Sequence, residues 1–383
     1  MTARMIIPLS LLIAFLAAGC GAPSAERPAR KVPTARPPAV YTVGKSLIGA
    51  PGGARVALAA APVTPLAGWL TPAVVPSPDG RYVAYNAWQA LREDDPALSW
   101  ADQGIARGDP LARPSIRLHN VAAGTDDVFA DGAFSLAWRS DGAVAYFQGD
   151  EPEYRAGVPY RGQIVVRESL GAPAQAWTTQ SARYVVAGWA GSTLLAYEEQ
   201  EGEALDVLAL DGPGRIRTLA RDSGLVAISP DGREALVERG PESGPPTVRT
   251  IAVATGAVRA ALDLTSVDPA VGVAGYSGDW QGDLAVASSS SGLAVFRIGD
   301  GRIGLEQAIS VAGEGVAEPR FAADGDRLTG WVTTPGGGAF LDCDRASGTC
   351  QRVVPLPTAR GVRGFSAWRR PAYNPSRPQE GER

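Results

Sequence analysis

The segment Val226–Val237 reads VAISPDGREALV. Two short apolar runs flank its Ser-Pro-Asp-Gly core, in which Pro and Asp favour the start of a tight turn and Gly tolerates a positive φ. The segment therefore predicts a β-hairpin in which Asp231 shapes the turn and is not a catalytic carboxylate. The same interpretation applies to the aspartates of the related turns, which are Asp79, Asp141 and Asp324.

This hairpin pattern recurs six times, and its turn glycines are Gly80, Gly142, Gly191, Gly232, Gly282 and Gly325. Each copy supplies an inner strand pair, A and B, and a second apolar pair, C and D, follows it. Four short strands per 40–60 residues are typical of a β-propeller blade. An unfinished copy at Gly364–Trp368 and apolar runs at Val40–Val43 and Arg55–Ala59 predict one more blade, built from both chain ends. We therefore predict an all-β propeller of seven four-stranded blades, with six or eight left open.

The full motif at Ser77–Arg81 and in Val226–Val237 resembles the TolB-type propeller repeat, a relative of the WD repeat. The resemblance covers residues 68–370 and implies the propeller fold. It says little about function, because one fold can carry many functions.

The N-terminus resembles that of a bacterial lipoprotein. Residues 1–19 contain an apolar run of 13 residues, which is too short to span a membrane and suits a signal peptide. The run ends in Leu16–Cys20, LAAGC, which resembles a lipobox and implies that Cys20 is lipidated. A secretory signal with a free Cys20 is the alternative. Residues 20–39 are rich in Pro and Arg and read as an extended tether. The propeller then occupies residues 40–370, and residues 371–383 form a polar tail.

Composition excludes several classes of function. The net charge of −4 argues against nucleic-acid binding. His119 is the single histidine, which removes most histidine-based metal sites and catalysis, and we expect it at a surface or half-buried strand position. The chain contains no Gly-x-Ser-x-Gly, Walker A or Rossmann motif. We predict neither a metal nor a cofactor.

Two sets of residues have structural interpretations. Large rings near the inner strands suit packing between blades better than a collar around a ligand. The tryptophans concerned are Trp69, Trp138, Trp189, Trp280, Trp331 and Trp368. Cys343 and Cys350 flank a short hairpin loop outside the cytoplasm, and we predict a disulfide between them.

The two longest B–C connections, at 88–114 and 148–161, emerge on the same rim of a propeller. Long loops in a compact repeat are usually functional, and acidic side chains mixed with Trp and Tyr suit recognition of a polypeptide or sugar. Solvated decoration is the alternative, and a calcium site at Glu93, Asp94 and Asp95 is a weaker one. The predicted ligand-binding residues are Trp88, Asp94, Asp95, Trp100, Tyr154, Arg155 and Tyr160.

Together these patterns favour a non-catalytic module anchored to a bacterial membrane on its extracytoplasmic side. It is expected to bind an envelope protein or glycan through the B–C loops. The alternative is an envelope hydrolase, lyase or lactonase with a carboxylate site at the axial funnel.

Overall fold

The computed structural model describes residues 39–43, 46–50, 55–60, 62, 74–90, 112–149, 154–155, 158–159, 161–179, 182–199, 205–239, 246–267, 273–289, 291–311, 316–322, 325–334, 337–355 and 362–367. All of them lie in one compact unit, Pro37–Arg383. They form strands, turns and a short 3-10 helix, η3 (Leu264–Ser266). None of the helical structure in these stretches has the length and apolarity that crossing a membrane requires.

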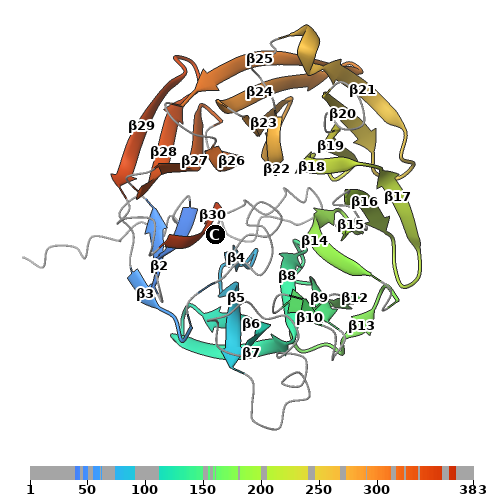
Figure 1. Ribbon diagram of the computed structural model, residues 1–383, viewed down its shortest axis with the longest axis vertical. Helices are drawn as coiled ribbons and strands as arrows, with labels where there is room; N and C mark the ends of the chain where they lie inside the picture. Colours follow the sequence, from blue (N-terminus) through green and yellow to red (C-terminus); the bar gives the residue numbers. More distant parts are fainter. Residues whose placement is uncertain are drawn as a thin grey trace, which may run out of the picture. The chain divides into compact units, whose positions relative to one another are not determined.

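Seven antiparallel four-stranded sheets are arranged around an axis as blades (Figure 1). Strand A of each blade is innermost and strand D outermost. Blade 1 contains, from A to D, β4 (Val74–Pro76), β5 (Tyr82–Ala90), β6 (Ala112–Asn120) and β7 (Thr125–Asp131). Blade 2 contains β8 (Ala133–Trp138), β9 (Val144–Gly149), β12 (Gly162–Arg167) and β13 (Gln175–Ala176). Blade 3 contains β14 (Arg183–Ala190), β15 (Thr193–Glu199), β16 (Leu205–Leu210) and β17 (Ile216–Ala220).

The next three blades repeat this order. Blade 4 contains β18 (Ser223–Ile228), β19 (Glu234–Arg239), β20 (Thr247–Ala252) and β21 (Val258–Asp263). Blade 5 contains β22 (Val273–Gln281), β23 (Leu284–Ser289), β24 (Gly292–Gly299) and β25 (Arg302–Ser310). Blade 6 contains β26 (Val316–Phe321), β27 (Arg327–Thr334), β28 (Gly337–Asp344) and β29 (Thr349–Pro355). The predicted all-β fold with seven blades is therefore confirmed.

Blade 7 joins the two ends of the chain. Its inner strand is β30 (Val362–Ala367), and the N-terminal strands follow outward as β1 (Ala39–Val43), β2 (Ser46–Ala50) and β3 (Arg55–Ala57). β1 and β30 pair antiparallel, with Ala39 opposite Ala367. Because β30 also contacts β26 of blade 6 and β4 of blade 1, the ring is closed (Figure 1).

The A–B turns owe their shape to the Ser-Pro-Asp-Gly motif. In blade 1 the Ser77 hydroxyl donates to Oδ1 of Asp79 at 2.6 Å, and the same carboxylate oxygen accepts from the N–H of Arg81 at 3.0 Å. Gly80 has a φ of 69°, which a residue with a side chain adopts at a cost. The turn at Asp231 in blade 4 repeats these contacts. The structure therefore supports the turn-forming interpretation of these aspartates, whereas Asp324 lies outside the described residues.

The core lies between blades, because each sheet packs both of its faces against neighbours. One cluster combines Val185 and Leu195 of blade 3 with Leu225 of blade 4. Hydroxyl groups also cross from one blade to the next inner strand. The Tyr197 hydroxyl accepts from the N–H of Leu225 at 2.8 Å, and the Ser135 hydroxyl accepts from the N–H of Val186 at 2.7 Å. Both contacts satisfy backbone groups beside a β-bulge, where the sheet itself leaves them unpaired.

The tryptophans of the inner strands join neighbouring blades. The indole N–H of Trp138 in blade 2 donates to the Val75 carbonyl of blade 1 at 3.1 Å, and that of Trp189 donates to Ala137 of blade 2 at 3.3 Å. Trp280 of blade 5 packs in a cluster that includes blade 4. Packing between blades is therefore confirmed for these three. The Trp331 side chain, Trp69 and Trp368 lie outside the described structure.

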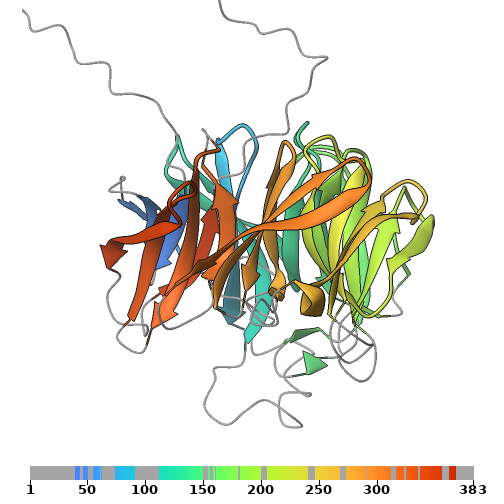
Figure 2. The same ribbon diagram turned by 90° about the horizontal axis from the view of Figure 1, so that it is seen from above.

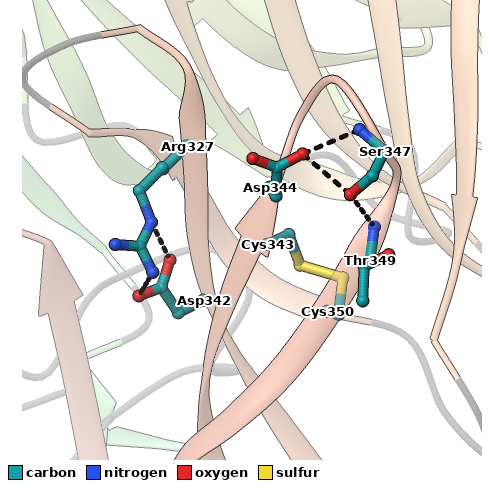
Figure 3. Close-up of a disulfide and its surroundings, with 7 residues drawn as sticks. All are labelled: Arg327, Asp342, Cys343, Asp344, Ser347, Thr349 and Cys350. Carbon is teal, nitrogen blue, oxygen red and sulfur yellow. Dashed lines mark hydrogen bonds and ion pairs between the residues drawn. A yellow bond between two sulfur atoms is a disulfide. The ribbon is translucent and has the colours of Figure 1, made fainter.

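Cys343 and Cys350 form a disulfide across the C–D hairpin of blade 6 (Figure 3). They stand directly opposite each other on β28 and β29, with Cα atoms 3.9 Å apart. The Asp344 carboxylate caps the hairpin loop by accepting from the N–H and the hydroxyl of Ser347, both at 2.7 Å. The disulfide closes a loop of few residues, so its role is to hold an outer hairpin.

Candidate functional site

The residues predicted for ligand binding belong to two connections of which the structure describes only a part. Trp88 was expected in a loop, but β5 extends to Ala90 and pairs Trp88 with Pro114 of β6. Tyr154 and Arg155 form β10, which pairs with β11 (Val158–Pro159) in a separate hairpin below the ring in Figure 2. The other predicted ligand-binding residues lie outside the described residues: Asp94, Asp95, Trp100 and Tyr160. So do Cys20, the predicted lipidation site, and Glu93 of the alternative calcium site.

The prediction of a surface or half-buried His119 was wrong, because this side chain is 1% exposed. Its Nδ1 lies 3.1 Å from Oδ2 of Asp126, and the hydroxyl of Tyr85 donates to Oδ1 of Asp126 at 2.7 Å. Burial, followed by the hydrogen bond to Asp126, raises the pKa of Tyr85 above its ordinary value. The strand sequence alone does not show this burial, since both faces of a propeller blade are covered by neighbouring blades.

Asp126 also connects blade 7 to blade 1. Its Oδ2 accepts a hydrogen bond from the backbone N–H of Ala59 at 3.1 Å, just beyond β3. The neighbouring N–H of Ala60 donates to the Tyr85 hydroxyl at 3.4 Å. This buried cluster, Tyr85, His119 and Asp126, therefore has a structural role: it attaches the N-terminal strands to the ring.

Ionisable groups gather instead at the ends of the strands in blades 3 and 4. Strands B and C meet their B–C connection there, at 200–204 and 240–245, so we call this end of the blades the B–C edge. Successive contacts link the groups across the two blades. We name the polar network by its members: Tyr184, Glu198, Asp206, Asp222, Ser223, Arg239 and Arg249.

The acidic part of the polar network belongs to blade 3. Glu198 and Asp206 stand opposite each other on β15 and β16. Asp206 is 7% exposed, and its Oδ1 accepts from the N–H of Asp222 at 3.2 Å. Burial, and next the negative charge of Asp206, raise the pKa of Glu198, although a hydrogen bond from Tyr184 opposes the shift. A carboxyl whose pKa is raised beside a second carboxyl group is a common arrangement for acid–base chemistry.

The basic part belongs to blade 4. Arg239 ends β19 opposite Ser223 of β18, and Arg249 stands on β20 opposite Val237. Nη2 of Arg249 donates to the Ser223 hydroxyl at 3.1 Å, and that hydroxyl donates to the Arg221 carbonyl at 2.6 Å. Burial, and next the positive charge of Arg239, lower the pKa of Arg249. The guanidinium groups of Arg239 and Arg249 therefore lie near each other in a half-buried position.

Glu238 lies beside the polar network but faces the other neighbour. It stands opposite Gly224 and Val248, and Val248 packs in the cluster between blades 4 and 5. Burial raises the pKa of Glu238 to about 8. The carboxyl is therefore largely protonated at neutral pH.

Replacing Glu238 with glutamine is expected to flatten the decline of stability with pH between about pH 5 and 8. The pKa of Glu238 is about 8 in the folded chain, against an ordinary value of 4.5, so in this range only the folded chain keeps the proton. The stability that this proton confers is complete below the unfolded pKa and is lost as pH rises through the folded pKa. Urea unfolding at a series of pH values measures the effect.

Glu234→Gln, at the other end of β19, is the matched control, and it should retain the wild-type slope. Parallel pH profiles for the wild type and Glu238→Gln would show that burial does not hold the proton on Glu238.

Sequence reasoning predicted the B–C rim but not these blades. The sequence does contain a feature that indicates these positions. Glu198 and Glu238 each follow the apolar run of their strand directly, at positions where the alternation points into the packing between blades. Because the connections after these strands are short, a prediction based on loop length selected the longer loops of blades 1 and 2 instead. The described residues contain no group of three or more His, Cys, Asp or Glu side chains suited to a metal ion.

No protein-family model and no curated protein sequence matches the chain. Among solved structures, a prolyl endopeptidase is 14% identical, with a TM-score of 0.54 over 88% of this chain and 50% of its own. An oligogalacturonate lyase in complex with manganese is 11% identical, with a TM-score of 0.51 over 77% and 81%. TolB from Acinetobacter baumannii is 12% identical, with a TM-score of 0.45 over 85% and 65%.

The chain thus spans about two thirds of the TolB chain and half of the endopeptidase chain. Likeness at such low identity concerns the arrangement of strands and not the residues of a site. It agrees with the seven sheets and the closed ring described above. The chain therefore has the β-propeller fold, which the propeller domain of the Trilobed protease from Pyrococcus furiosus also has.

Proposed function

We propose that the chain is a binding module of the bacterial envelope, lipid-anchored through Cys20, which recognises a protein or glycan at the B–C edge. The polar network of blades 3 and 4 is the observation that carries this proposal. Burying ionisable groups costs free energy that aliphatic side chains would not cost. Seven blades provide ample aliphatic core, so the network is better explained by recognition than by stability.

The membrane anchor is a separate part of the proposal and rests on the LAAGC motif at Leu16–Cys20. Metabolic labelling with a palmitate analogue tests it. The wild type should be labelled and should sediment with membranes, and Cys20→Ala should lose the label. A labelled Cys20→Ala variant, or an unlabelled wild type, would contradict lipidation at this residue.

The binding function is tested by cross-linking in cells, followed by purification from detergent-solubilised membranes. We compare the wild type with a variant of the long loops, Trp100→Ala with Tyr154→Ala and Tyr160→Ala. Arg233→Gln, at the exposed A–B turn of blade 4, is the control at the opposite edge. A partner held by the wild type and the control but not by the loop variant supports binding through those loops. Capture of no partner by the wild type would contradict the binding function.

A second function is favoured by Glu198 and Asp206. A carboxyl with a raised pKa beside a buried carboxylate suits general acid–base catalysis, as in a hydrolase, lyase or lactonase. Turnover of an acidic sugar or lactone that is lost in Glu198→Gln, with folding intact, would favour this class. Equal turnover in the variant and the wild type would exclude Glu198 from the reaction.

A further inference from the structure

Arg239, Arg249 and Ser223 share one face of blade 4. Arg239 is opposite both Ser223 of β18 and Thr247 of β20, and Arg249 lies two residues further along β20. Side chains on neighbouring strands that are offset by two residues point the same way and remain within reach of each other. Val237 stands opposite Arg249 and two residues before Arg239, so its side chain is on the same face as theirs, and it packs against blade 3. The two guanidinium groups therefore meet at the blade 3–blade 4 boundary.

The charge of this pair is not neutralised within the described residues. Nε of Arg249 is buried and has no hydrogen-bond partner there. The described residues also provide no carboxylate in an ion pair with either arginine, and the charge that lowers the pKa of Arg249 is the positive charge of Arg239. Arg139, which is also half-buried, differs because it pairs with Asp141 at 2.9 Å and also with Glu168. An unneutralised pair of half-buried cations is costly unless a ligand supplies the anion.

We infer that Arg239 and Arg249 bind a carboxylate on an acidic segment of the partner protein. This inference rests on the proposed function, because it takes the B–C edge as the binding surface and names the chemistry of its ligand. Guanidinium groups present planar pairs of donors that match the two oxygens of a carboxylate. Clusters of arginine recognise acidic peptides in this way.

The surroundings favour a singly charged group on a peptide. Asp206 lies nearby through Asp222, so a doubly charged phosphate would meet more repulsion than a carboxylate. Ala261, which stands opposite Arg249 on β21, is aliphatic and exposed, which suits the methylene groups of a peptide. Sugar recognition relies more on aromatic surfaces, and the hydroxyl of the neighbouring Tyr197 is engaged by Leu225.

Titration with a blocked peptide, acetyl-Gly-Asp-Glu-Asp-Gly-amide, tests the inference on the full chain. Calorimetry gives the affinity, and nitrogen-15 NMR follows the Nε–H signal of Arg249. We expect saturable binding that shifts this signal. Binding should be at least about tenfold weaker for the Asn-Gln-Asn peptide and for Arg249→Gln, since each removes charge-assisted hydrogen bonds. Arg249→Lys should bind with intermediate strength, and the control Arg233→Gln should bind as the wild type does.

Arg239→Gln, at the end of its strand, provides a second test in case Arg249→Gln unfolds, and thermal unfolding checks both variants. Equal affinity of the wild type and either folded variant would overturn the inference. Tighter binding of inorganic phosphate or of oligogalacturonate than of the peptide would overturn the assignment to an acidic peptide. Glu242, in the connection after β19, lies outside the described residues, and Glu242→Gln tests whether its carboxylate is the counter-ion of the two arginines. A gain above about tenfold in Glu242→Gln would identify it as that counter-ion and would also overturn the inference.

The two proposals fail separately. If the wild type and the Arg239→Gln, Arg249→Gln double variant capture the same cross-linked partner equally, the inference fails and the binding function stands. If the wild type captures no partner but binds the peptide through these arginines, the binding function fails and the carboxylate site stands.

Discussion

Replacing Asp126 with alanine is expected to lower the free energy of unfolding by about 3–5 kcal/mol. The change leaves a buried hydroxyl, a buried imidazole and a backbone N–H without their shared acceptor, at Tyr85, His119 and Ala59. Each lost hydrogen bond to a charged acceptor costs about 1.5–3 kcal/mol. Losses in one connected group do not add fully, which limits the total.

Urea unfolding monitored by tryptophan fluorescence measures this effect, and Asp127→Ala is the matched control. Asp127 is the exposed neighbour on β7, so its removal should change stability by less than about 0.5 kcal/mol. A loss below about 1 kcal/mol for Asp126→Ala would mean that the cluster does not hold the N-terminal strands to blade 1. Asp126→Asn keeps the shape of the side chain and one acceptor, so its loss of stability should lie between those of Asp126→Ala and Asp127→Ala.

The second large effect is expected at Gly232, where alanine should cost about 3 kcal/mol or more. Gly232 has a φ of 70°, and an added methyl group would lie 2.5 Å from the backbone nitrogen of Gly191 and 2.8 Å from the carbonyl carbon of Ala190. These are backbone atoms of the neighbouring A–B turn, so they yield only if blades 3 and 4 separate. The expected loss of stability therefore has two contributions: the steric overlap with blade 3 and the strain of a side-chain-bearing residue at a positive φ.

Gly191→Ala separates the two contributions. Gly191 has a similar φ of 62°, but an added methyl group meets nothing within 4 Å. We expect a loss of only about 1–2 kcal/mol there, from backbone strain alone. Equal losses at both glycines, measured by urea unfolding, would show that the turns of blades 3 and 4 are not in tight contact.

The blade count was predictable because its information is local. A Ser-Pro-Asp-Gly turn forms its contacts within five residues, as Ser77 and Asp79 do. Each copy of the motif therefore predicts one inner hairpin, whatever its position in the chain. The completion of blade 7 from both chain ends followed from counting strands, since the inner strand at β30 needed partners. The end of β5 was less predictable, because pairing with β6 extends it past the last strongly apolar residue.

The polar network was not predictable because its information is not local. Asp206 reaches Asp222 across the end of the C–D strand pair of blade 3, and Arg249 reaches Ser223 across two strands of blade 4, so these contacts join residues 16 and 26 positions apart. The burial of His119 depended likewise on which face of β6 receives the segment after β3. In both cases a side chain's environment is decided by segments distant in the sequence and not by the alternation along its own strand.

The closure of the ring has a consequence for how the chain is made. Strand β30 occupies the innermost place in blade 7, yet it is synthesised after all the other described strands. Its residue Ala367 follows its partner Ala39 by 328 positions (367 minus 39). Until then the backbone of β1 remains an open edge, which is a template for pairing with another chain. Such long-range pairing makes the last step slow. Nascent chains that lack the final strand should therefore be the species that aggregates and needs chaperones.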